Sequence, residues 1–172
     1  AHIARIEKMG YREVLEQLVA AGLESLPGAG AEILCDRVRK QLSPAKPDTQ
    51  AWFDVMHEAH KMNLATSATM VFGHIETAEE RIRYLIKIRE LQNERPEGSY
   101  GSLAFICWPL QHQGTKLGEQ IPPKPVSAEE YIRMIAVSRI MLNNITNIQA
   151  SWLTVGKDTA QLCLHAGAND MG

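Results

Sequence analysis

A glycine, a histidine and a glutamate stand close together after an apolar run, in the stretch ATMVFGHIET (68–77). Gly73 permits a positive φ and lets a ligand approach the backbone, although a tight strand-to-helix turn would need it equally. Glu76 could bind a ligand, or its charge could stabilise the N-terminus of the next helix. His74 could be catalytic, or an exposed or structural turn residue. The stretch therefore predicts a ligand site at a strand end without defining its chemistry.

Two further histidines and the three cysteines do not have the spacing of a metal or redox site. His57 and His60 are three residues apart, unlike the histidines of H-E-x-x-H, and we expect them on a solvated helix face. Cys35, Cys107 and Cys163 are scattered and form no C-x-x-C pair, which predicts buried, inert thiols in a reducing cytosol. We expect Cys35 and Cys163 on helices and Cys107 in a strand. No metal site is predicted within the chain.

Several function classes lack their signatures. G-x-S-x-G, the Walker loop and G-x-G-x-x-G are absent, and the GAG at 28–30 lacks a further glycine at the required spacing. A net charge of -2 over 172 residues gives no electrostatic support for nucleic-acid binding. No apolar run approaches the ~20 residues of a membrane span. The start, AHIARIEKMGYREV, has no apolar signal-peptide core, so we expect a cytoplasmic protein.

The elements that would position these residues alternate along the chain. Apolar runs predict strands, and a 3.6-residue apolar period predicts helices. The predicted strands are 23–26, 66–72, 101–108 and 147–155, with a short strand end in 166–170. The predicted helices are 3–21, 31–40, 50–62, a long one from Thr77 past Leu91, 128–144 and 157–165. The predicted caps are Asp48 or Thr49, Thr77 in a capping box with Glu80, and Ser127. Residues 109–127 are predicted to be a long loop.

This order predicts an α/β fold with a parallel sheet covered by helices. Two geometries fit: a slice of a (β/α) barrel, and a doubly wound flavodoxin-like sheet. A complete barrel needs about 250 residues. The chain 1–172 is therefore predicted to be a single fragment, half a barrel with two open strand edges. In either geometry chemistry collects at the carboxyl ends of the strands.

Five segments are informative when taken together: GLESLPGAGAEILCDRVRKQLSP, ATMVFGHIET, AFICWPLQHQGTKL, NIQASWLTVG and GAND. They resemble the corresponding segments of one family, the radical SAM enzymes of menaquinone biosynthesis. The likeness covers the whole chain in order. Gly73 and Glu76 also fit the looser radical SAM motif G-x-I-x-G-x-x-E, although its first glycine is absent. Within the family, WP and NIQASW favour the cyclic dehypoxanthine futalosine synthases over the aminofutalosine synthases and the radical SAM subunit of deazaflavin (FO) synthase.

The resemblance implies strands four to eight of a radical SAM (β/α)8 barrel. It also implies S-adenosylmethionine, a [4Fe-4S] cluster and a 5'-deoxyadenosyl radical, which abstracts hydrogen from the ribose of dehypoxanthine futalosine before cyclisation. The cluster motif C-x-x-x-C-x-x-C is absent. We therefore expect an N-terminal barrel half, on the same or a separate chain, to hold the cluster, and this chain alone to be inactive. The alternatives are a non-catalytic barrel half that dimerises over its open edges, and an unrelated α/β hydrolase-like or binding domain.

The resemblance also implies roles for individual residues, although no catalytic residue is identified. The residues expected to bind S-adenosylmethionine are Ser25 at the ribose, then Met70, Phe72, Gly73, Glu76, Ile106 and Trp108. The residues expected at the sugar hydroxyls or the benzoate of the substrate are Glu32, Gln149 and Ser151. Glu32 could instead pair with Arg37 or Arg39. Trp108 and Trp152 could belong to the core, and Asn169 and Asp170 could end a strand or cap a turn. The chain departs from the family pattern at Ala29, in LQHQGT and at Val155, where substrate contacts could differ.

Overall fold

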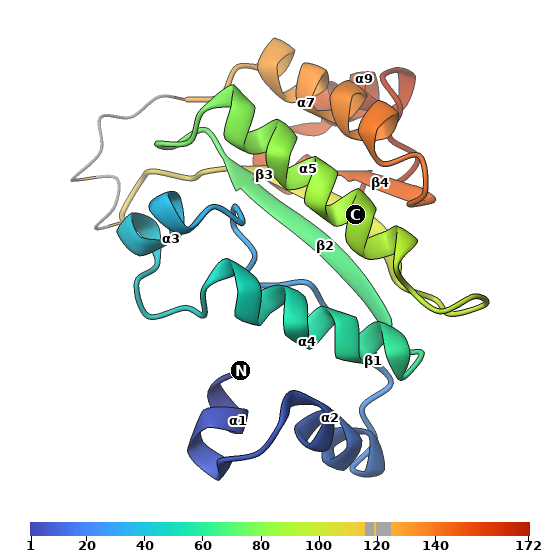
Figure 1. Cartoon of the computed structure of the whole chain (residues 1–172). Coiled ribbons are helices and arrows are strands. Elements are labelled where there is room, and N and C mark those ends of the chain that lie inside the picture. Colours follow the sequence, from blue (N-terminus) through green and yellow to red (C-terminus); the bar gives the residue numbers. More distant parts are fainter. Residues whose placement is uncertain (116–118, 120–124) are drawn as a thin grey trace.

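The computed structural model describes residues 1–115, 119 and 125–172 and contains a parallel sheet of four strands (Figure 1). The strands are β1 (Ser25–Leu26), β2 (Ala65–Phe72), β3 (Ser102–Pro109) and β4 (Asn147–Ala150), in the spatial order β1-β2-β3-β4. Each strand pairs with the next one in the chain. Right-handed crossovers that always advance in one direction place the connecting helices on the same face of the sheet. This arrangement is that of a (β/α) barrel segment and excludes the doubly wound alternative, in which the strand order reverses.

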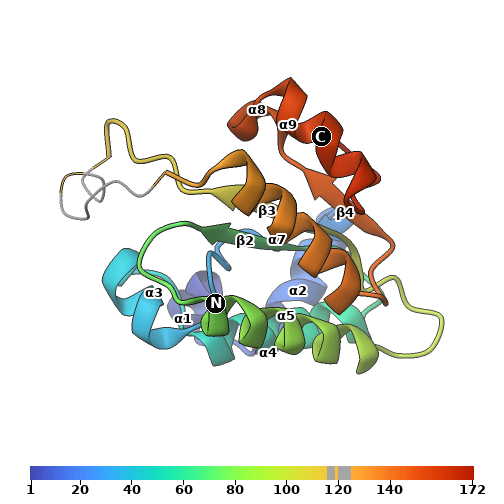
Figure 2. The same ribbon diagram turned by 90° about the horizontal axis from the view of Figure 1, so that it is seen from above.

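The connecting helices build one hydrophobic core against that face. They are α4 (Thr49–Lys61), α5 (Ala78–Asn93), α7 (Ala128–Met141) and α9 (Lys157–His165). Figure 2 shows α4 and α5 on the same side of β2. The strand register aligns Ala68, Phe105 and Ile148 across the sheet, and all three side chains are fully buried in this core. We call this side the helix-covered face.

The other side of the sheet, which we call the open face, is covered by none of these four helices. Side chains alternate along a strand, so every second residue belongs to this face. Its members are Ser67, Thr69 and Val71 of β2, Ala104, Ile106 and Trp108 of β3, and Asn147 and Gln149 of β4. All of them except Thr69 are partly exposed. In a complete barrel this face would line the interior.

Chain beyond α9 returns to the edge of the sheet. Gln149 forms a parallel bridge with Asp170, and the amide of Ala150 donates to the Asp170 carbonyl at 2.9 Å. The Asn169 side chain accepts from the Ile148 amide at 2.9 Å. The predicted strand end at 166–170 is therefore present as the beginning of a fifth parallel strand.

The predicted single helix 3–21 is wrong, because two helices occupy this range. They are α1 (His2–Glu7) and α2 (Tyr11–Ala20). Lys8 takes a left-handed φ of 54° and ends α1. The amide of Gly10 donates to the side chain of Glu13, which begins α2. The apolar spacing matched a helix, but a local chain reversal overrides it.

The predicted helix 31–40 begins later, as α3 (Asp36–Leu42). The preceding segment lies beside β2 instead: the Val71 amide donates to the Glu32 carbonyl at 2.8 Å. Glu32 has a φ of 40°, which a helix cannot contain. Arg39 is 4% exposed and donates to the carbonyls of Gly30 and Ala31, so a buried guanidinium fixes this non-helical loop.

The predicted strand 147–155 is also too long. β4 ends at Ala150, and α8 (Trp152–Val155) follows at once. The predicted caps are confirmed: the side chain of Asp48 caps α4, the Thr77–Glu80 capping box begins α5, and Ser127 caps α7. The predicted loop 109–127 lies partly outside the described residues, at 116–118 and 120–124.

The solvated helix face predicted for His57 and His60 holds for only one of them. His60 is 1% exposed and its Nε2 lies 2.9 Å from Thr66 Oγ1, because this face of α4 packs on β2. His57 is partly exposed and pairs with Glu94. Cys35 precedes α3 and is only half-buried, whereas Cys107 and Cys163 are buried as expected. No helix within the described ranges has the length and apolar character to cross a membrane.

Candidate functional site at the carboxyl ends of the strands

The strands end at one common edge, which we call the rim. Phe72 lies opposite Pro109, and Cys107 lies opposite Ala150 in the register. The ends of β2, β3 and β4 are therefore neighbours, as the barrel prediction requires. The rim comprises the turn 73–77 after β2, the chain directly after β3 and β4, and the segment around Glu32 that pairs with Val71.

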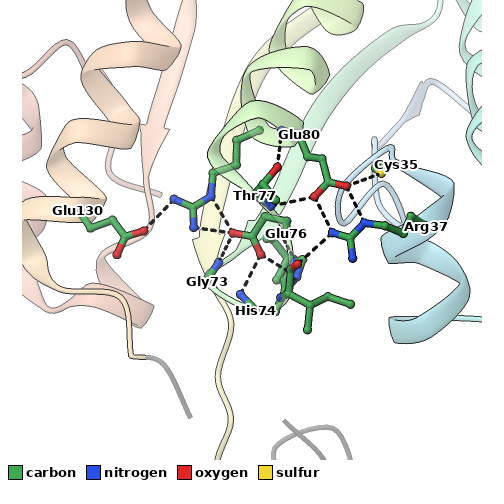
Figure 3. A network of polar contacts seen from close by, with 11 residues as sticks. Cys35, Arg37, Gly73, His74, Glu76, Thr77, Glu80 and Glu130 are labelled. Atoms are coloured by element: carbon green, nitrogen blue, oxygen red, sulfur yellow. Dashed lines mark hydrogen bonds and ion pairs between the residues drawn. The ribbon is translucent and has the colours of Figure 1, made fainter. Parts of the chain in front are cut away.

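A fully buried carboxylate organises the turn after β2 (Figure 3). The Glu76 side chain has 0% exposure and accepts from the amides of Gly73 at 2.7 Å and His74 at 2.9 Å. Arg81 Nε donates to the same carboxylate at 2.7 Å. Gly73 has a φ of 85°, which glycine adopts without strain. Glu76 therefore holds the turn in shape, and its oxygens are occupied by protein donors.

The charge of Glu76 is stabilised although it is buried. Burial opposes ionisation, but hydrogen bonds from the His74 side chain and the Gly73 amide outweigh it and lower the pKa of Glu76 to about 2. His74 Nδ1 lies 2.7 Å from Glu76 and Nε2 lies 2.9 Å from the Val71 carbonyl. Both ring nitrogens of His74 thus face protein partners, and a structural role explains this histidine without a ligand.

Arg81 connects this turn to the next β/α unit. Its Nη1 donates to Glu130 of α7 at 2.8 Å, while its guanidinium carbon lies 4.7 Å from the centroid of the Phe72 ring. The side chain is only 15% exposed. Arg81 therefore links the end of β2 to the start of α7.

A second arginine holds the turn from the other side, as Figure 3 also shows. Arg37 of α3 donates to the Ile75 carbonyl at 3.0 Å and to Glu80 at 2.7 Å. Glu80 also accepts from the Thr77 amide and from Cys35 Sγ. The hydrogen bond from Arg37 is the main cause that lowers the pKa of Glu80 to about 2. The turn is thus fixed between α3 and α7.

Glu32 pairs with neither arginine considered from the sequence. Its Oε1 accepts from Lys46, whereas Arg37 binds Glu80 and Arg39 binds backbone carbonyls. Its Oε2 is buried and has no partner within the described part of the chain. A buried carboxylate oxygen without a donor is costly unless something else supplies one. Glu32 therefore remains a candidate for a ligand contact near the rim.

The open face supplies a second group of candidates next to the rim. Ile106 lies between Thr69 and Gln149 in the register, and Trp108 lies opposite Val71. Ser151 directly follows β4, and its hydroxyl has no hydrogen-bond partner among the residues that the structure describes. Apolar side chains beside amide and hydroxyl groups suit a flat base joined to a sugar. The structure thus brings four of the predicted residues together: Ile106, Trp108, Gln149 and Ser151.

Three predicted residues lie elsewhere. Met70 and Phe72 have 0% exposure on the helix-covered face, so their side chains do not reach the open face. Ser25 pairs with Ala65 at the start of β2, seven residues along that strand from its end at Phe72. At ~3.3 Å per residue this is more than 20 Å from the rim. A contact of Ser25 with the same nucleoside is not supported by this placement.

Some of the residues that shape the rim were missed by sequence reasoning. Arg81 and Lys46 were given no role from the sequence, Arg37 was considered only as a partner of Glu32, and Tyr131 was predicted as a core residue of its helix. Arg81 and Glu130 lie 49 residues apart in different β/α units, and Lys46 and Glu32 lie 14 residues apart on either side of α3. Apolar period and strand-end motifs carry no signal for such contacts.

A cavity of about 560 Å³ lies beside the rim, between the chain after β3 and the starts of α7 and α9. Its walls include Leu110, His112, Tyr131, Thr154 and Val155. Both ring nitrogens of His112 are buried without a partner in the described residues. The positions where the sequence departs from the family pattern, in LQHQGT and at Val155, thus contribute to one cavity.

The thiols of the chain do not form a cluster site. Cys35 precedes α3, Cys107 is in β3 and Cys163 is in α9, and no group of three metal-binding side chains occurs among the described residues. Burial raises the pKa of Cys107 to about 12 and that of Cys163 to about 11, so both stay protonated at neutral pH. These residues do not fit a [4Fe-4S] cluster.

Comparison with known proteins gives consistent relatives. Residues 99–172 match the family model described as the CofH/MqnC C-terminal region. The chain is 41% identical to a 5-amino-6-(D-ribitylamino)uracil–L-tyrosine 4-hydroxyphenyl transferase of Methanosarcina mazei, with 99% of this chain and 46% of the relative covered. It is 40% identical to the cyclic dehypoxanthine futalosine synthase of Streptomyces coelicolor, with 99% and 41% covered. It is 36% identical to the aminodeoxyfutalosine synthase of Thermus thermophilus, with 99% and 45% covered. The chain thus spans about half the length of these curated relatives.

Proposed function

We propose that this chain, which carries the C-terminal region of the CofH/MqnC family of radical SAM enzymes, forms one wall of a nucleoside site in a (β/α)8 barrel. One observation supports this most: the open face and the rim place Trp108, Gln149 and Ser151 at the ends of neighbouring parallel strands. Active sites of barrel enzymes lie at this end. The connecting helices α4, α5, α7 and α9, by contrast, pack on the opposite face.

The reaction proposed for the complete enzyme is the conversion of dehypoxanthine futalosine to its cyclic form in menaquinone biosynthesis. The relative from Streptomyces coelicolor carries this activity in its name. S-adenosylmethionine would supply the 5'-deoxyadenosyl radical that removes a hydrogen atom from the ribose of the substrate. The part assigned to this chain is to bind and orient the two nucleosides and to exclude water.

Individual roles follow from placement. Ile106 and Trp108 offer an apolar wall for the adenine, and the backbone of Gly73 lies at the rim beside it. Gln149 and Ser151 offer an amide and a hydroxyl to sugar hydroxyls. Glu32 could accept one further hydrogen bond through its partnerless oxygen. Glu76 acts through the turn it holds and has no direct contact in this proposal.

The open face and the two free strand edges need a partner that covers them. We propose that strands one to three of the barrel pair with the two free edges, at β1 and beyond residue 170, and that they hold the [4Fe-4S] cluster. This half could belong to the same or to a separate chain. In this proposal the chain alone has no activity, and the complete enzyme acts in the cytoplasm. A homodimer that covers the open edges is the competing arrangement.

A second candidate reaction has a specific observation in its favour. The identity with the 4-hydroxyphenyl transferase is 41%, against 40% with the futalosine enzyme. Transfer of a 4-hydroxyphenyl group from L-tyrosine to 5-amino-6-(D-ribitylamino)uracil would use the same barrel. Its substrate also carries sugar-like hydroxyls, so the roles of Gln149 and Ser151 would be similar.

The test uses the full-length protein with reconstituted cluster and each substrate set in turn. We expect 5'-deoxyadenosine to form with dehypoxanthine futalosine, and turnover to fall in Glu32→Gln and Gln149→Ala while the fold survives. Gln50→Ala is the matched control, because Gln50 is exposed on α4 and its side chain binds only Asp54 among the residues that the structure describes. Product formation with tyrosine and the ribitylaminouracil alone would select the second reaction. Unchanged turnover in both variants would remove Glu32 and Gln149 from the site.

A further inference from the structure

Tyr131 of α7 joins the ends of two strands through one hydroxyl group. Its Oη donates to the carbonyl of Cys107 in β3 at 2.9 Å and accepts from the amide of Ser151 after β4 at 2.9 Å. Both bonds are buried, and Tyr131 is 1% exposed. The hydroxyl thus fixes the rim at the point where β3 and β4 end.

The ring of Tyr131 is held as firmly as its hydroxyl. It stacks on Phe72 at the end of β2, with ring centroids 6.1 Å apart and an angle of 18° between the planes. Arg81 lies against the other ring of this pair, at 4.7 Å from the Phe72 centroid. Burial raises the pKa of Tyr131 above its ordinary value, so the phenol keeps the proton that it donates to Cys107.

Ser151 is held through its carbonyl and its amide. The carbonyl accepts from the amides of Thr154 at 3.0 Å and Val155 at 3.2 Å and from the Thr154 hydroxyl at 2.9 Å, but the hydroxyl of Ser151 forms no cap bond to α8. Among the described residues, the hydroxyl of Tyr131 is the only hydrogen-bond partner of the Ser151 amide. The Ser151 hydroxyl is therefore positioned by backbone that Tyr131 helps to fix, one residue beyond the Cys107–Ala150 pair.

We infer that Tyr131 is a positioning residue that sets the location of Ser151 in the nucleoside site. This inference rests on the proposed function, because it gives Ser151 a ligand to meet. Tyr131 does not itself touch the ligand. Its effect passes through one hydrogen bond to one backbone amide, which makes the role separable from the packing of its ring.

The test is Tyr131→Phe in the full-length protein, which removes the hydroxyl and keeps the stacked ring. Tyr84→Phe is the matched control: Tyr84 is also 1% exposed and donates one bond, to the Thr69 carbonyl at 2.5 Å, in the middle of β2. Each variant loses one buried hydroxyl, which makes two hydrogen bonds in Tyr131 and one in Tyr84. We expect a larger loss of thermal stability in Tyr131→Phe than in Tyr84→Phe, and a rise of roughly tenfold in the KM for the nucleoside substrate in Tyr131→Phe alone.

A further variant separates positioning from stability. In Ser151→Ala the ligand contact is already gone, so adding Tyr131→Phe should raise the KM little further. Equal KM values in Tyr131→Phe and Tyr84→Phe, with an active wild-type enzyme, would overturn the positioning role and leave the proposed function standing. A wild-type enzyme that cleaves no S-adenosylmethionine with any of the substrates would overturn the proposed function, and this inference with it.

Discussion

The buried polar groups at the two ends of the sheet differ in their charge. Where the strands begin, the linked groups are neutral: His60 Nε2 lies 2.9 Å from Thr66 Oγ1, which lies 3.2 Å from Ser102 Oγ, while His60 Nδ1 is buried without a partner among the described residues. Gln92 accepts from the Ser102 amide at 2.7 Å and donates to its carbonyl at 3.2 Å. We call this group the base network.

At the rim the corresponding groups are charged, and some are left without partners. Glu76 and Arg81 form a buried ion pair, whereas Glu32 Oε2 has no donor in the described residues and the hydroxyl of Ser151 is free. A neutral network suits stability, while preorganised charges and an unpaired carboxylate oxygen suit a ligand. Buried atoms without partners occur at both ends of the sheet, so the binding end is distinguished by its buried charges.

The largest expected effect comes from removing the buried charge of Glu76 at the rim. Glu76→Gln removes the carboxylate that Arg81 and His74 surround, and should lower the free energy of unfolding by about 3 kcal/mol at pH 7. The folded pKa of about 2 lies below the ordinary 4.5, so the contribution is complete above pH 4.5 and is lost as pH falls toward 2. Urea unfolding at pH 7 and pH 3 measures the difference. Glu79→Gln is the control, because that side chain is 71% exposed. Equal losses in both variants would contradict the buried role of Glu76.

The next prediction concerns the base network. Burial, then the nearby charges of His57 and Arg95, lower the pKa of His60 from 6.5 to about 4. The unfolded chain therefore binds a proton that the folded chain excludes, and stability falls as pH drops from about 6.5 toward 4. Between pH 7 and pH 5 we expect the free energy of unfolding to fall by about 2 kcal/mol less in His60→Gln than in the wild type.

His57→Gln serves as the control for that pH series, since its ring is 33% exposed. The measurement is urea unfolding of the three proteins at pH 7, 6 and 5. A wild-type curve parallel to that of His60→Gln would show that the base network does not exclude a proton, and the contrast between the two ends would weaken.

The smallest expected effect concerns the neutral helix cap at Ser127, which lies close to the charged groups of the rim. Ser127→Ala removes a neutral, exposed cap bond to the amide of Glu130 at 3.2 Å, and should cost about 1 kcal/mol. It lies next to the charged network without belonging to it. Thermal unfolding measures the loss, and a cost as large as that of Glu76→Gln would mean that charge and burial do not distinguish the two contacts.

The strands and most caps could be predicted from the sequence because their signals are local. The apolar run before Gly73 and the spacing of Thr77 and Glu80 each fix an element within a few residues. The helix predicted at 31–40 does not begin at Ala31, because the Val71 amide of β2 donates to the Glu32 carbonyl and Arg39 donates to the Ala31 carbonyl. These are tertiary contacts, which override local helix propensity and leave no signal in the local sequence pattern.

The candidate site was predictable to a smaller extent. Strand alternation places Ile106 and Gln149 on one face once the register is known, but the sequence does not show which face the helices cover. Met70 and Phe72 were assigned to the ligand from the family resemblance, although both side chains are fully buried in the core on the helix-covered face. Lys46 was missed because its contact with Glu32 spans α3, and Tyr131 because its contacts join separate β/α units.

The central claim is that the open face and the rim bind a nucleoside inside a completed barrel. A crystal structure of the full-length protein with S-adenosylmethionine and substrate tests it most directly. We expect the free edges of the sheet to pair with further strands, and nucleoside atoms to lie within ~4 Å of Trp108 and Ser151. Nucleosides bound away from the rim, or an open face packed against a helix, would contradict the account.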